Sequence, residues 1–503
     1  MDMSDISIKN ADQFLPLYAQ IAKEIRTAIS SGELSPGTRL PAVTELAATK
    51  GVTAATVRRA LKDLTDEGLI YSHVGRGTFI TEPATRAPEP RPEDRPRSGR
   101  AESERDIREL MALANREGVI AFTRGIGDPE TVPKGTLTRL AHEALEGGEE
   151  MFLDYGDPRG LLPLRESIAN LYRERSLAIG PENVLVTSGS QQALALIARE
   201  AAEKGTPVAC ETPCYSGVLN AFEAFAVRPV FVERDSRGPR PERLPEGGAS
   251  GFAGGLLYLC PILHNPMGTD IAPDRQALAV EWARRTGSVI LADEIFRDLH
   301  FGPEAPASFL GSLGTERSIV LGSLSKSFIS GLRVGWLIAS EERIRSLTAV
   351  KKAMDLGCPP LMQGIARVFL EDESGYRAHG ALVREHYRIR RDAALSALDR
   401  NMPEGVEWTR PAGGFQLWLS LPAGYSAVEL LVRAVEAGAS FLPGALQWTG
   451  NPSGEDYSAS LRLCYGSLKP EEIEEGIARL ARATRSYLAE SSARPDYSGL
   501  GDF

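Results

Sequence analysis

The chain has 503 residues, of which 42% are hydrophobic, and a formal net charge of −10 at pH 7, as in ordinary globular proteins. This charge excludes a protein that coats nucleic acid along its whole surface, but not one small DNA-reading domain. The five cysteines show neither metal-ligand nor disulfide-framework spacing, and we recognise neither a signal peptide nor a membrane span. The length predicts about three domains. From the cysteine spacing and from the lack of a signal peptide and a membrane span, we expect no metal site, no membrane partner and a cytoplasmic location.

A helix-turn-helix is predicted near the start of the chain. Four apolar residues recur there at helical spacing, namely Leu17, Ile21, Ile25 and Ile29. Gly32 ends that helix, a short helix is predicted over 43–49, and another over 54–64 with Thr53 as its N-cap. Two short helices joined by a tight turn are typical of a motif whose second helix reads the major groove of DNA.

A hairpin with a Gly-Arg-Gly tip is predicted over 71–80, as in the winged variant of this motif, and it places Arg76 for a phosphate. The segment 14–81 resembles the GntR-type winged helix. Four stretches carry the resemblance, namely Pro16-Leu17-Tyr18, Gly37-Thr38-Arg39-Leu40-Pro41, Glu67-Gly68-Leu69-Ile70 and Gly75-Arg76-Gly77-Thr78-Phe79. The candidate DNA-binding residues are Thr53, Thr56, Arg58, Arg59 and Arg76.

The predicted DNA-binding face is weakly basic. Thr44 and Ala54 stand where the GntR-type family often carries arginine, and residues 1–82 hold nine basic against ten acidic side chains. A phosphate-binding surface needs positive charge. Two hypotheses therefore remain open: a domain that binds DNA, or a fold retained for folding or dimer contacts.

A charged, proline-rich segment over 83–106 interrupts the pattern of helices and strands. Five prolines alternate there with charged residues, and no apolar side chain is larger than alanine. Such a segment cannot bury a core and predicts an extended, partly stiff linker. The expected organisation is a winged helix-turn-helix over 10–82, the linker over 83–106, one large domain over 107–490 and a tail over 491–503.

The large domain alternates helical patterns with short β-rich runs. Five runs are predicted as strands, over 183–187, 207–211, 256–260, 288–292 and 318–322. Strands that alternate with helices indicate an α/β fold with a mostly parallel sheet and crossover connections.

Lys326 stands among serines in the loop Gly322-Ser323-Leu324-Ser325-Lys326-Ser327, and Arg333 follows seven positions later. A lysine that forms a Schiff base with an aldehyde cofactor requires such surroundings, because hydroxyls and an arginine can bind the phosphate of the cofactor. Taken alone, the loop could equally be a Ser/Gly-rich surface segment.

Further stretches fit the same cofactor. Ser190 and Gln191 open a helix after a predicted strand, which makes an anion site. Tyr215 follows the next strand and could stack on a flat ring, and Asn265 offers an amide to a ring hydroxyl. Asp293 ends an apolar run, where a carboxylate can pair with a protonated pyridine nitrogen. Individually, these residues also fit a capped helix, a core tyrosine, a Pro/Gly turn and an N-cap.

Together, these stretches resemble the fold-type I pyridoxal-phosphate proteins of the aminotransferase class over about residues 107–490. The resemblance implies a large domain with a mostly parallel sheet, a smaller α+β domain, and a homodimer with shared sites. The implied catalytic residues are Lys326, which binds the cofactor covalently, and Asp293, which pairs with its ring nitrogen. The other implied roles are the phosphate for Ser190, Gln191, Ser323 and Arg333, ring stacking for Tyr215, the 3-hydroxyl for Asn265, the partner subunit's phosphate for Tyr155, and the substrate carboxylate for Arg462.

Phe296 departs from the family pattern. Three residues after the ring aspartate the family commonly has a tyrosine that donates to the 3-hydroxyl, whereas this chain has Phe296. Losing that donor is expected to raise the pKa of the lysine–cofactor linkage and to slow ordinary transamination.

The whole arrangement resembles the MocR-type regulators, which join a GntR-type winged helix to an aminotransferase-like domain. In that family an amino acid or amine reacts with the bound pyridoxal phosphate, and the resulting movement changes how the dimer sits on DNA. The alternative is a pyridoxal-phosphate enzyme acting on an amino acid, with a vestigial winged helix. That enzyme could be an aminotransferase or a specialised catalyst of elimination, substitution or carbon–carbon bond formation.

Overall fold

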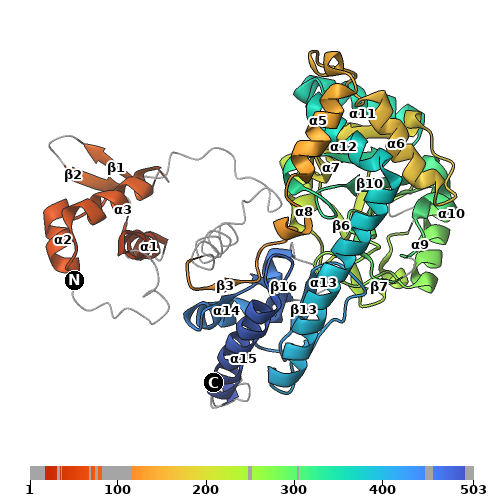
Figure 1. Cartoon of the computed structure of the whole chain (residues 1–503). Coiled ribbons are helices and arrows are strands. Elements are labelled where there is room, and N and C mark those ends of the chain that lie inside the picture. Colours follow the sequence, from red (N-terminus) through yellow and green to blue (C-terminus); the bar gives the residue numbers. More distant parts are fainter. Residues whose placement is uncertain are drawn as a thin grey trace. The chain divides into compact units, whose positions relative to one another are not determined.

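The computed structural model describes residues 17–30, 34–35, 37–66, 69–73, 77–81, 116–246, 252–302, 305–447 and 457–492. Two compact units are present, 1–98 and 99–503, and each is described by itself (Figure 1). The predicted linker over 83–106 lies outside the described residues, as does the predicted tail from residue 493 onward. Within the described residues no helix is long and apolar enough to cross a membrane.

The N-terminal unit is a winged helix-turn-helix, as predicted. It consists of α1 (Leu17–Ser30), α2 (Val43–Lys50), α3 (Ala54–Asp66) and the antiparallel hairpin β1 (Ile70–His73) with β2 (Gly77–Ile80). Apolar side chains from all three helices and both strands, among them Ile21, Leu46 and Val57, form one buried core. Gly51, at φ +63°, ends α2 in the left-handed conformation and makes the tight turn before α3.

The large domain of the C-terminal unit is built on an eight-stranded sheet in the order β4-β11-β10-β9-β8-β5-β6-β7. Six strands run parallel, whereas β11 and β7 run against their neighbours. The strands are β4 (Val184–Thr187), β5 (Val208–Thr212), β6 (Val230–Asp235), β7 (Gly238–Pro239), β8 (Leu256–Leu259), β9 (Val289–Asp293), β10 (Ser318–Ser323) and β11 (Gly335–Ile338). The five predicted strands are confirmed to within one residue at each end.

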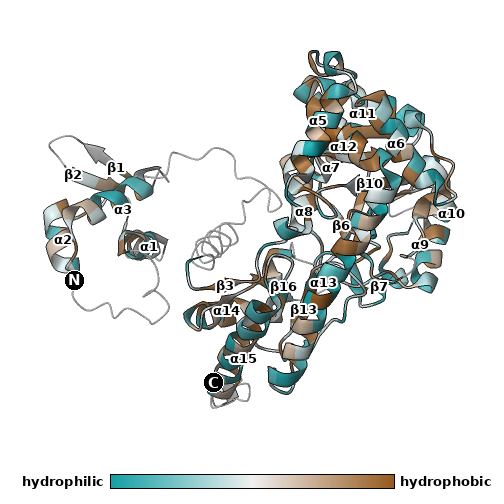
Figure 2. Ribbon diagram, in the orientation of Figure 1, coloured by the Kyte–Doolittle hydropathy of each residue, from teal (hydrophilic) through white to brown (hydrophobic). Residues whose placement is uncertain are grey.

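Helices cover both faces of this sheet, so its central strands are buried on both sides. Along β8, Leu257 and Leu259 belong to one hydrophobic cluster, whereas Leu256 and Tyr258 belong to another. Figure 2 shows apolar strands beneath helices that carry polar residues on their outer surfaces. The covering helices are α5 (Thr136–Glu146), α6 (Leu162–Arg173), α7 (Ser190–Lys204), α8 (Ser216–Ala224), α9 (Pro273–Thr286), α10 (Phe309–Arg317), α11 (Glu341–Asp355) and α12 (Pro360–Glu371).

The smaller α+β domain, also predicted, has an antiparallel sheet in the order β12-β13-β16-β15 and its own buried core. A separate, parallel pair of strands joins β3 (Ile120–Ala121) to β14 (Ala439–Ser440). The remaining elements are α13 (Glu373–Asn401), β12 (Glu407–Trp408), β13 (Gln416–Ser420), α14 (Ala427–Glu436), β15 (Leu442–Pro443), β16 (Ser460–Cys464) and α15 (Pro470–Ser492).

Candidate functional site

Five predicted site residues lie at or after the carboxyl ends of parallel strands. Ser190 comes after β4, Tyr215 after β5 and Asn265 after β8, while Asp293 ends β9 and Lys326 follows β10. β5, β8, β9 and β10 are neighbours that run in one direction, and β4 runs the same way on the far side of the antiparallel strand β11. The carboxyl ends of parallel strands share one edge of a sheet, where ligands of α/β folds bind.

Lys326 lies at the centre of this edge. Its Nζ donates to the carbonyl oxygen of Gly125 at 2.6 Å and lies 6.0 Å from the centroid of the Phe296 ring. Burial lowers the pKa of Lys326, and the charge of Arg462 acts in the same direction. A lowered pKa favours the neutral amine, which is the nucleophilic form of a lysine.

Asp293 is a buried carboxylate beside Lys326, only 2% exposed. Its Oδ2 accepts from the Tyr258 hydroxyl at 3.0 Å, and its Oδ1 accepts from the backbone N–H of Ile295 at 3.4 Å. Burial raises the pKa of Asp293 to about 6, although both hydrogen bonds and the charge of Lys326 oppose this rise. At neutral pH the carboxylate is therefore mainly ionised and available to a cation.

Arg462 reaches the same place from β16 of the smaller domain. Its Nη1 donates to Oδ1 of Asn265 at 2.9 Å, and its Nη2 donates to the carbonyl oxygen of Thr123 at 3.4 Å. Its buried Nε has no hydrogen-bond partner among the described residues. A buried guanidinium with an unused N–H is suited to an anionic ligand, since a carboxylate can accept two parallel hydrogen bonds from it.

Groups that could bind an anion lie close together at the start of α7. Gly189, at φ +83°, leads into the helix, and Arg333 Nη2 donates to the carbonyl oxygen of Ser188 at 3.0 Å. The Ser323 hydroxyl accepts from the backbone N–H of Ser325 at 3.1 Å. Free N–H groups of a helix N-terminus beside a guanidinium and hydroxyls form a setting that binds phosphate.

Tyr215 and Gln191 form one contact on this side of the site. The Tyr215 hydroxyl donates to Oε1 of Gln191 at 3.3 Å, while Nε2 of Gln191 donates to the carbonyl oxygen of Gly217 at 2.8 Å. Burial raises the pKa of Tyr215, with the charge of Asp293 acting in the same direction. Through these two hydrogen bonds the amide of Gln191 links the Tyr215 hydroxyl to the backbone of Gly217.

Phe296 lies three residues after Asp293, where the family commonly has a tyrosine, and it offers no hydroxyl. It is buried, and its ring packs edge-on against Phe415 with centroids 5.6 Å apart. Because Lys326 also lies near this ring, the lysine is bordered there by an apolar wall.

One unpartnered hydroxyl and two hydrogen bonds of this site were not predicted from the sequence. The buried hydroxyl of Ser325 has no hydrogen-bond partner among the described residues, so it is available to a ligand. The Tyr258 hydroxyl on Asp293 and the Gly125 carbonyl on Lys326 join residues far apart in the chain. Ser325 could have been found, since it adjoins Lys326 among other hydroxyl residues; the other two leave no local sequence signal.

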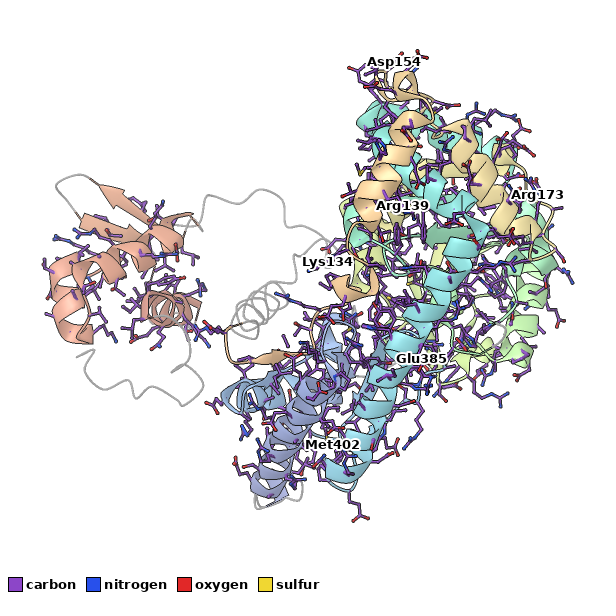
Figure 3. The ribbon with its side chains drawn as sticks, in the orientation of Figure 1. Lys134, Arg139, Asp154, Arg173, Glu385 and Met402 are labelled. Atoms are coloured by element: carbon purple, nitrogen blue, oxygen red, sulfur yellow. The ribbon has the colours of Figure 1, made fainter. Side chains whose placement is uncertain are left out.

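Tyr155 is not brought together with these residues within the chain. It lies in the loop after the short helix over Glu149–Phe152, and its side chain is 73% exposed. Its neighbour Asp154 marks this loop at one end of the C-terminal unit (Figure 3).

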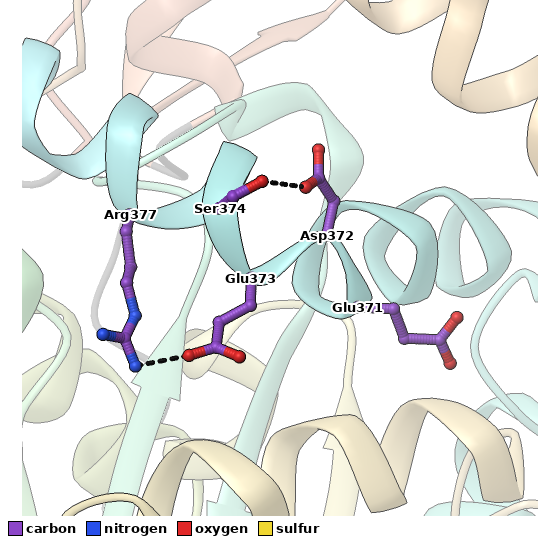
Figure 4. A pocket seen from close by; sticks show the side chains of 5 residues that line it. All are labelled: Glu371, Asp372, Glu373, Ser374 and Arg377. Atoms are coloured by element: carbon purple, nitrogen blue, oxygen red, sulfur yellow. Dashed lines mark hydrogen bonds and ion pairs between the residues drawn. The ribbon is translucent and has the colours of Figure 1, made fainter.

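A separate surface depression of about 470 Å³ lies where α12 meets α13 (Figure 4). Its polar groups already bind one another: Asp372 accepts from the backbone N–H of Gly375 at 2.9 Å and from the Ser374 hydroxyl at 3.0 Å. Glu373 pairs with Arg377 at 2.5 Å. These are contacts of a capped helix start, and none of the predicted site residues lines the depression.

The predicted DNA-binding residues that the structure describes are Thr53, just before α3, and Thr56, Arg58 and Arg59 on α3. The Thr53 hydroxyl accepts from the backbone N–H of Thr56 at 3.2 Å, which confirms the predicted N-cap. Arg58 is exposed, whereas the guanidinium of Arg59 lies 4.4 Å from the centroid of the Tyr18 ring. Arg76 lies outside the described residues.

Comparison with known proteins decides the family. Residues 125–480 match the family described as aminotransferase class I and II, and residues 17–80 match the bacterial regulatory proteins of the gntR family. The chain belongs to the aminotransferase class I and II family. In it, a GntR-type helix-turn-helix is fused to the aminotransferase domain, which is the MocR-type arrangement predicted from the sequence.

The chain has relatives among aminotransferases and among transcriptional regulators. A 2-aminoadipate transaminase of Thermus thermophilus is 36% identical over 76% of the chain and 94% of its own length. An uncharacterised HTH-type transcriptional regulator of Bacillus subtilis, YisV, is 31% identical over 94% of the chain and 96% of its own length. The chain is thus similar to aminotransferases over its C-terminal unit and to transcriptional regulators over almost its whole length.

Solved structures agree on the aminotransferase fold. A kynurenine aminotransferase of Pyrococcus horikoshii is 30% identical with a TM-score of 0.71, over 76% of the chain and 95% of its own. LysN of Thermus thermophilus, an α-aminoadipate aminotransferase complexed with N-(5'-phosphopyridoxyl)-L-leucine, is 33% identical with a TM-score of 0.68, over 76% of the chain and 95% of its own.

Proposed function

We propose that this protein is a pyridoxal-phosphate-dependent transcriptional regulator that senses an amino acid or amine through its aminotransferase-family domain. The observation that carries the proposal is the convergence of Lys326, Asp293 and Arg462 on one sheet edge, in a chain that also has a GntR-type domain. The first two are suited to an aldehyde cofactor with a cationic ring, and the third to a carboxylate.

The residues present fit pyridoxal phosphate. Two observations favour the fit, namely the unpartnered Ser325 hydroxyl and the Arg462 Nε, because each offers an unused hydrogen-bonding group at the site. Pyridoxal phosphate supplies an aldehyde that condenses with amines and a ring that withdraws electrons. The proposed roles are a covalent link for Lys326, the ring nitrogen for Asp293, the 3-hydroxyl for Asn265, stacking for Tyr215, and the phosphate for Ser190, Gln191, Ser323, Arg333 and Ser325.

The surroundings of Lys326, Arg462 and Phe296 explain the different role proposed for each side chain. Burial lowers the pKa of Lys326, so its amine loses a proton more readily and can later hold one at Nζ. Arg462 orients an incoming amino acid by its α-carboxylate. Phe296 excludes water beside Lys326 without offering a hydrogen bond. The same set is compatible with sensing and with turnover, since both begin with binding of an amine.

Replacing Gly189 with alanine should weaken cofactor binding. Gly189 has φ +83° and ψ 168°, a region that only glycine populates readily, and a Cβ there would lie 2.5 Å from Nη2 of Arg333. We expect a loss of roughly 1–3 kcal/mol in the free energy of unfolding, and displacement of Arg333 from the phosphate site. The matched control is Gly205→Ala at the other end of α7, which has φ +62° but open space around it. Urea unfolding and cofactor titration check both variants; equal cofactor affinities would contradict the role given to Arg333.

DNA is the proposed partner of the N-terminal unit, in the form of a direct or inverted repeat near the chain's own gene. Arg58 projects from α3, the recognition helix of such a motif. Thr53 and Thr56 share a hydrogen bond at 2.8 Å at the start of that helix, and Arg59 and Arg76 are the further candidates.

Arg58→Ala should reduce the salt dependence of specific DNA binding. If the guanidinium neutralises one phosphate, the slope of log K against log salt should fall by about 0.9. Arg139→Ala, which removes an exposed arginine of α5 in the other unit, is the charge-matched control. Fluorescence anisotropy over a salt series measures the slopes. Equal slopes for both variants would remove Arg58 from the interface, and wild-type binding no tighter than to random DNA would favour the enzyme.

A homodimer is proposed because Tyr155 and two leucines in neighbouring segments are exposed. Leu153 and Leu356 are 78% and 48% exposed, and a Cβ on Gly357 would lie 3.4 Å from the carbonyl oxygen of Tyr155. Exposed apolar patches mark interaction surfaces. Pairing of two chains there would let Tyr155 reach the partner's phosphate site.

A pyridoxal-phosphate enzyme acting on an amino acid is the second candidate. The name of the Thermus relative supports it, as do Thr44 and Ala54 on the N-terminal unit. The deciding experiment titrates the full-length protein, loaded with cofactor, with 2-aminoadipate, aromatic amino acids and simple amines. It records the visible spectrum, the product and the affinity for DNA. A ligand-dependent change in DNA affinity without turnover supports the regulator; turnover without such a change supports the enzyme.

A further inference from the structure

The carboxylate of Asp293 is held by a tyrosine from the neighbouring strand. Tyr258 of β8 lies opposite Leu291 of β9, so Asp293, two residues further along, points to the same face of the sheet. This diagonal arrangement brings the Tyr258 hydroxyl to 3.0 Å from Oδ2 of Asp293. The contact follows from the strand register and not from proximity in the chain.

Tyr258 is not required at this position as an apolar filler. It is fully buried within the cluster formed by Leu256, Leu291 and Leu321, where phenylalanine would fill nearly the same volume. A buried hydroxyl costs free energy unless it is hydrogen-bonded. The hydrogen bond to Asp293 therefore offsets the free-energy cost of burying this hydroxyl.

We propose that Tyr258 is a positioning residue that keeps Asp293 oriented and ionised for a cationic ring nitrogen, an inference that rests on the proposed cofactor site. Donation to Oδ2 fixes one carboxylate oxygen. Among the described residues, Oδ1 accepts only the long 3.4 Å hydrogen bond from the Ile295 backbone, so it can accept another from a ligand. A hydrogen bond to the charged form of a buried acid favours that form.

The pH response of Asp293 depends on several neighbours. The groups that act on it or are acted on by it are Tyr258 and Cys260 around β8, Glu294 after β9, Lys326 after β10 and Tyr215 after β5. Tyr258 is the side chain among them that donates directly to the carboxylate. Its removal should move protonation of Asp293 to higher pH, because the ionised form loses its donor while burial is unchanged.

The test is a double-mutant cycle on the full-length protein, with pyridoxal phosphate as the probe. Wild type, Tyr258→Phe, Asp293→Asn and the double variant are compared by cofactor affinity, from mildly acidic to mildly alkaline pH, and by the visible spectrum. Tyr172→Phe is the matched control, because its buried hydroxyl accepts from Nε1 of Trp336 at 3.1 Å in another part of the domain. A cycle isolates the coupling between two residues from their separate effects on packing.

We expect Tyr258→Phe to lower cofactor affinity about tenfold or more, and to move the acid limit of binding to higher pH. In the Asp293→Asn background the same change should have little further effect. Equal losses in both backgrounds, or a loss no larger than that of Tyr172→Phe, would overturn the inference and leave the cofactor site standing. A wild type that binds no cofactor would instead overturn the proposed function, and the inference with it.

Discussion

Replacing Lys326 with alanine is expected to abolish the visible absorption band that the wild type acquires on incubation with pyridoxal phosphate. The reason is chemical: Lys326 is the lysine whose charge acts on Asp293, and the charge of Arg462 acts on Lys326 in turn. A covalent link to the aldehyde requires a neutral primary amine, which the lowered pKa of Lys326 favours. Absorption spectra after removal of free cofactor provide the measurement.

Lys326→Arg is the matched variant for this prediction. It retains a positive charge beside Asp293 but cannot form the link, so it should also lack the band while it keeps part of the cofactor affinity. If the band survives in Lys326→Ala, another lysine carries the cofactor. A colourless wild type would refute the cofactor proposal altogether.

Arg462→Ala should weaken the spectral response to α-amino acids by about 10- to 150-fold, which corresponds to roughly 1.5–3 kcal/mol for a hydrogen-bonded charged group. Arg462 is 7% exposed, and its Nε has no hydrogen-bond partner among the described residues. A carboxylate would therefore lose a desolvated bidentate partner. Titration of the bound cofactor with amino acids, followed in the visible spectrum, measures the change.

Two controls separate carboxylate binding from an indirect effect. Arg462→Lys retains the charge without the planar fork, so it should recover only part of the response. Amines that lack a carboxylate should respond nearly equally in wild type and variant. If they lose as much as the amino acids, Arg462 acts through its contact with Asn265. An unchanged amino-acid response would mean that the ligand has no carboxylate or binds elsewhere.

Much of the fold could be predicted because local pattern and packing agree. The buried strands are short apolar runs bounded by turns, so β5 and β9 begin and end within one residue of the predicted limits. The parallel order then explains the meeting of the site segments, since each was predicted just after a strand. Lys326 and Asp293 could be assigned to one edge for this reason.

The remaining contacts depend on register and on long-range folding, which a single sequence does not encode locally. Tyr258 meets Asp293 only because β8 pairs with β9 in one register. The Gly125 carbonyl reaches Lys326 from about 200 residues earlier in the chain. Likewise, Arg59 was predicted as a DNA contact, and its stacking on Tyr18 brings together α1 and α3.

The hydrogen bond between Arg462 and Asn265 also fixes which end of the asparagine amide faces a ligand. A guanidinium can only donate, so Oδ1 of Asn265 is turned toward Arg462 and the NH₂ group is left for the other side. An amide NH₂ stabilises an anionic oxygen, which partly compensates for the hydroxyl that Phe296 lacks. In the proposed site one guanidinium therefore serves two anions, a ligand carboxylate directly and the phenolic oxygen of the cofactor through Asn265. If Arg462 and Asn265 have the roles proposed for them, a ligand that draws Arg462 toward itself would weaken its hydrogen bond to Asn265. Carboxylate recognition would then be coupled to the electronic state of the cofactor.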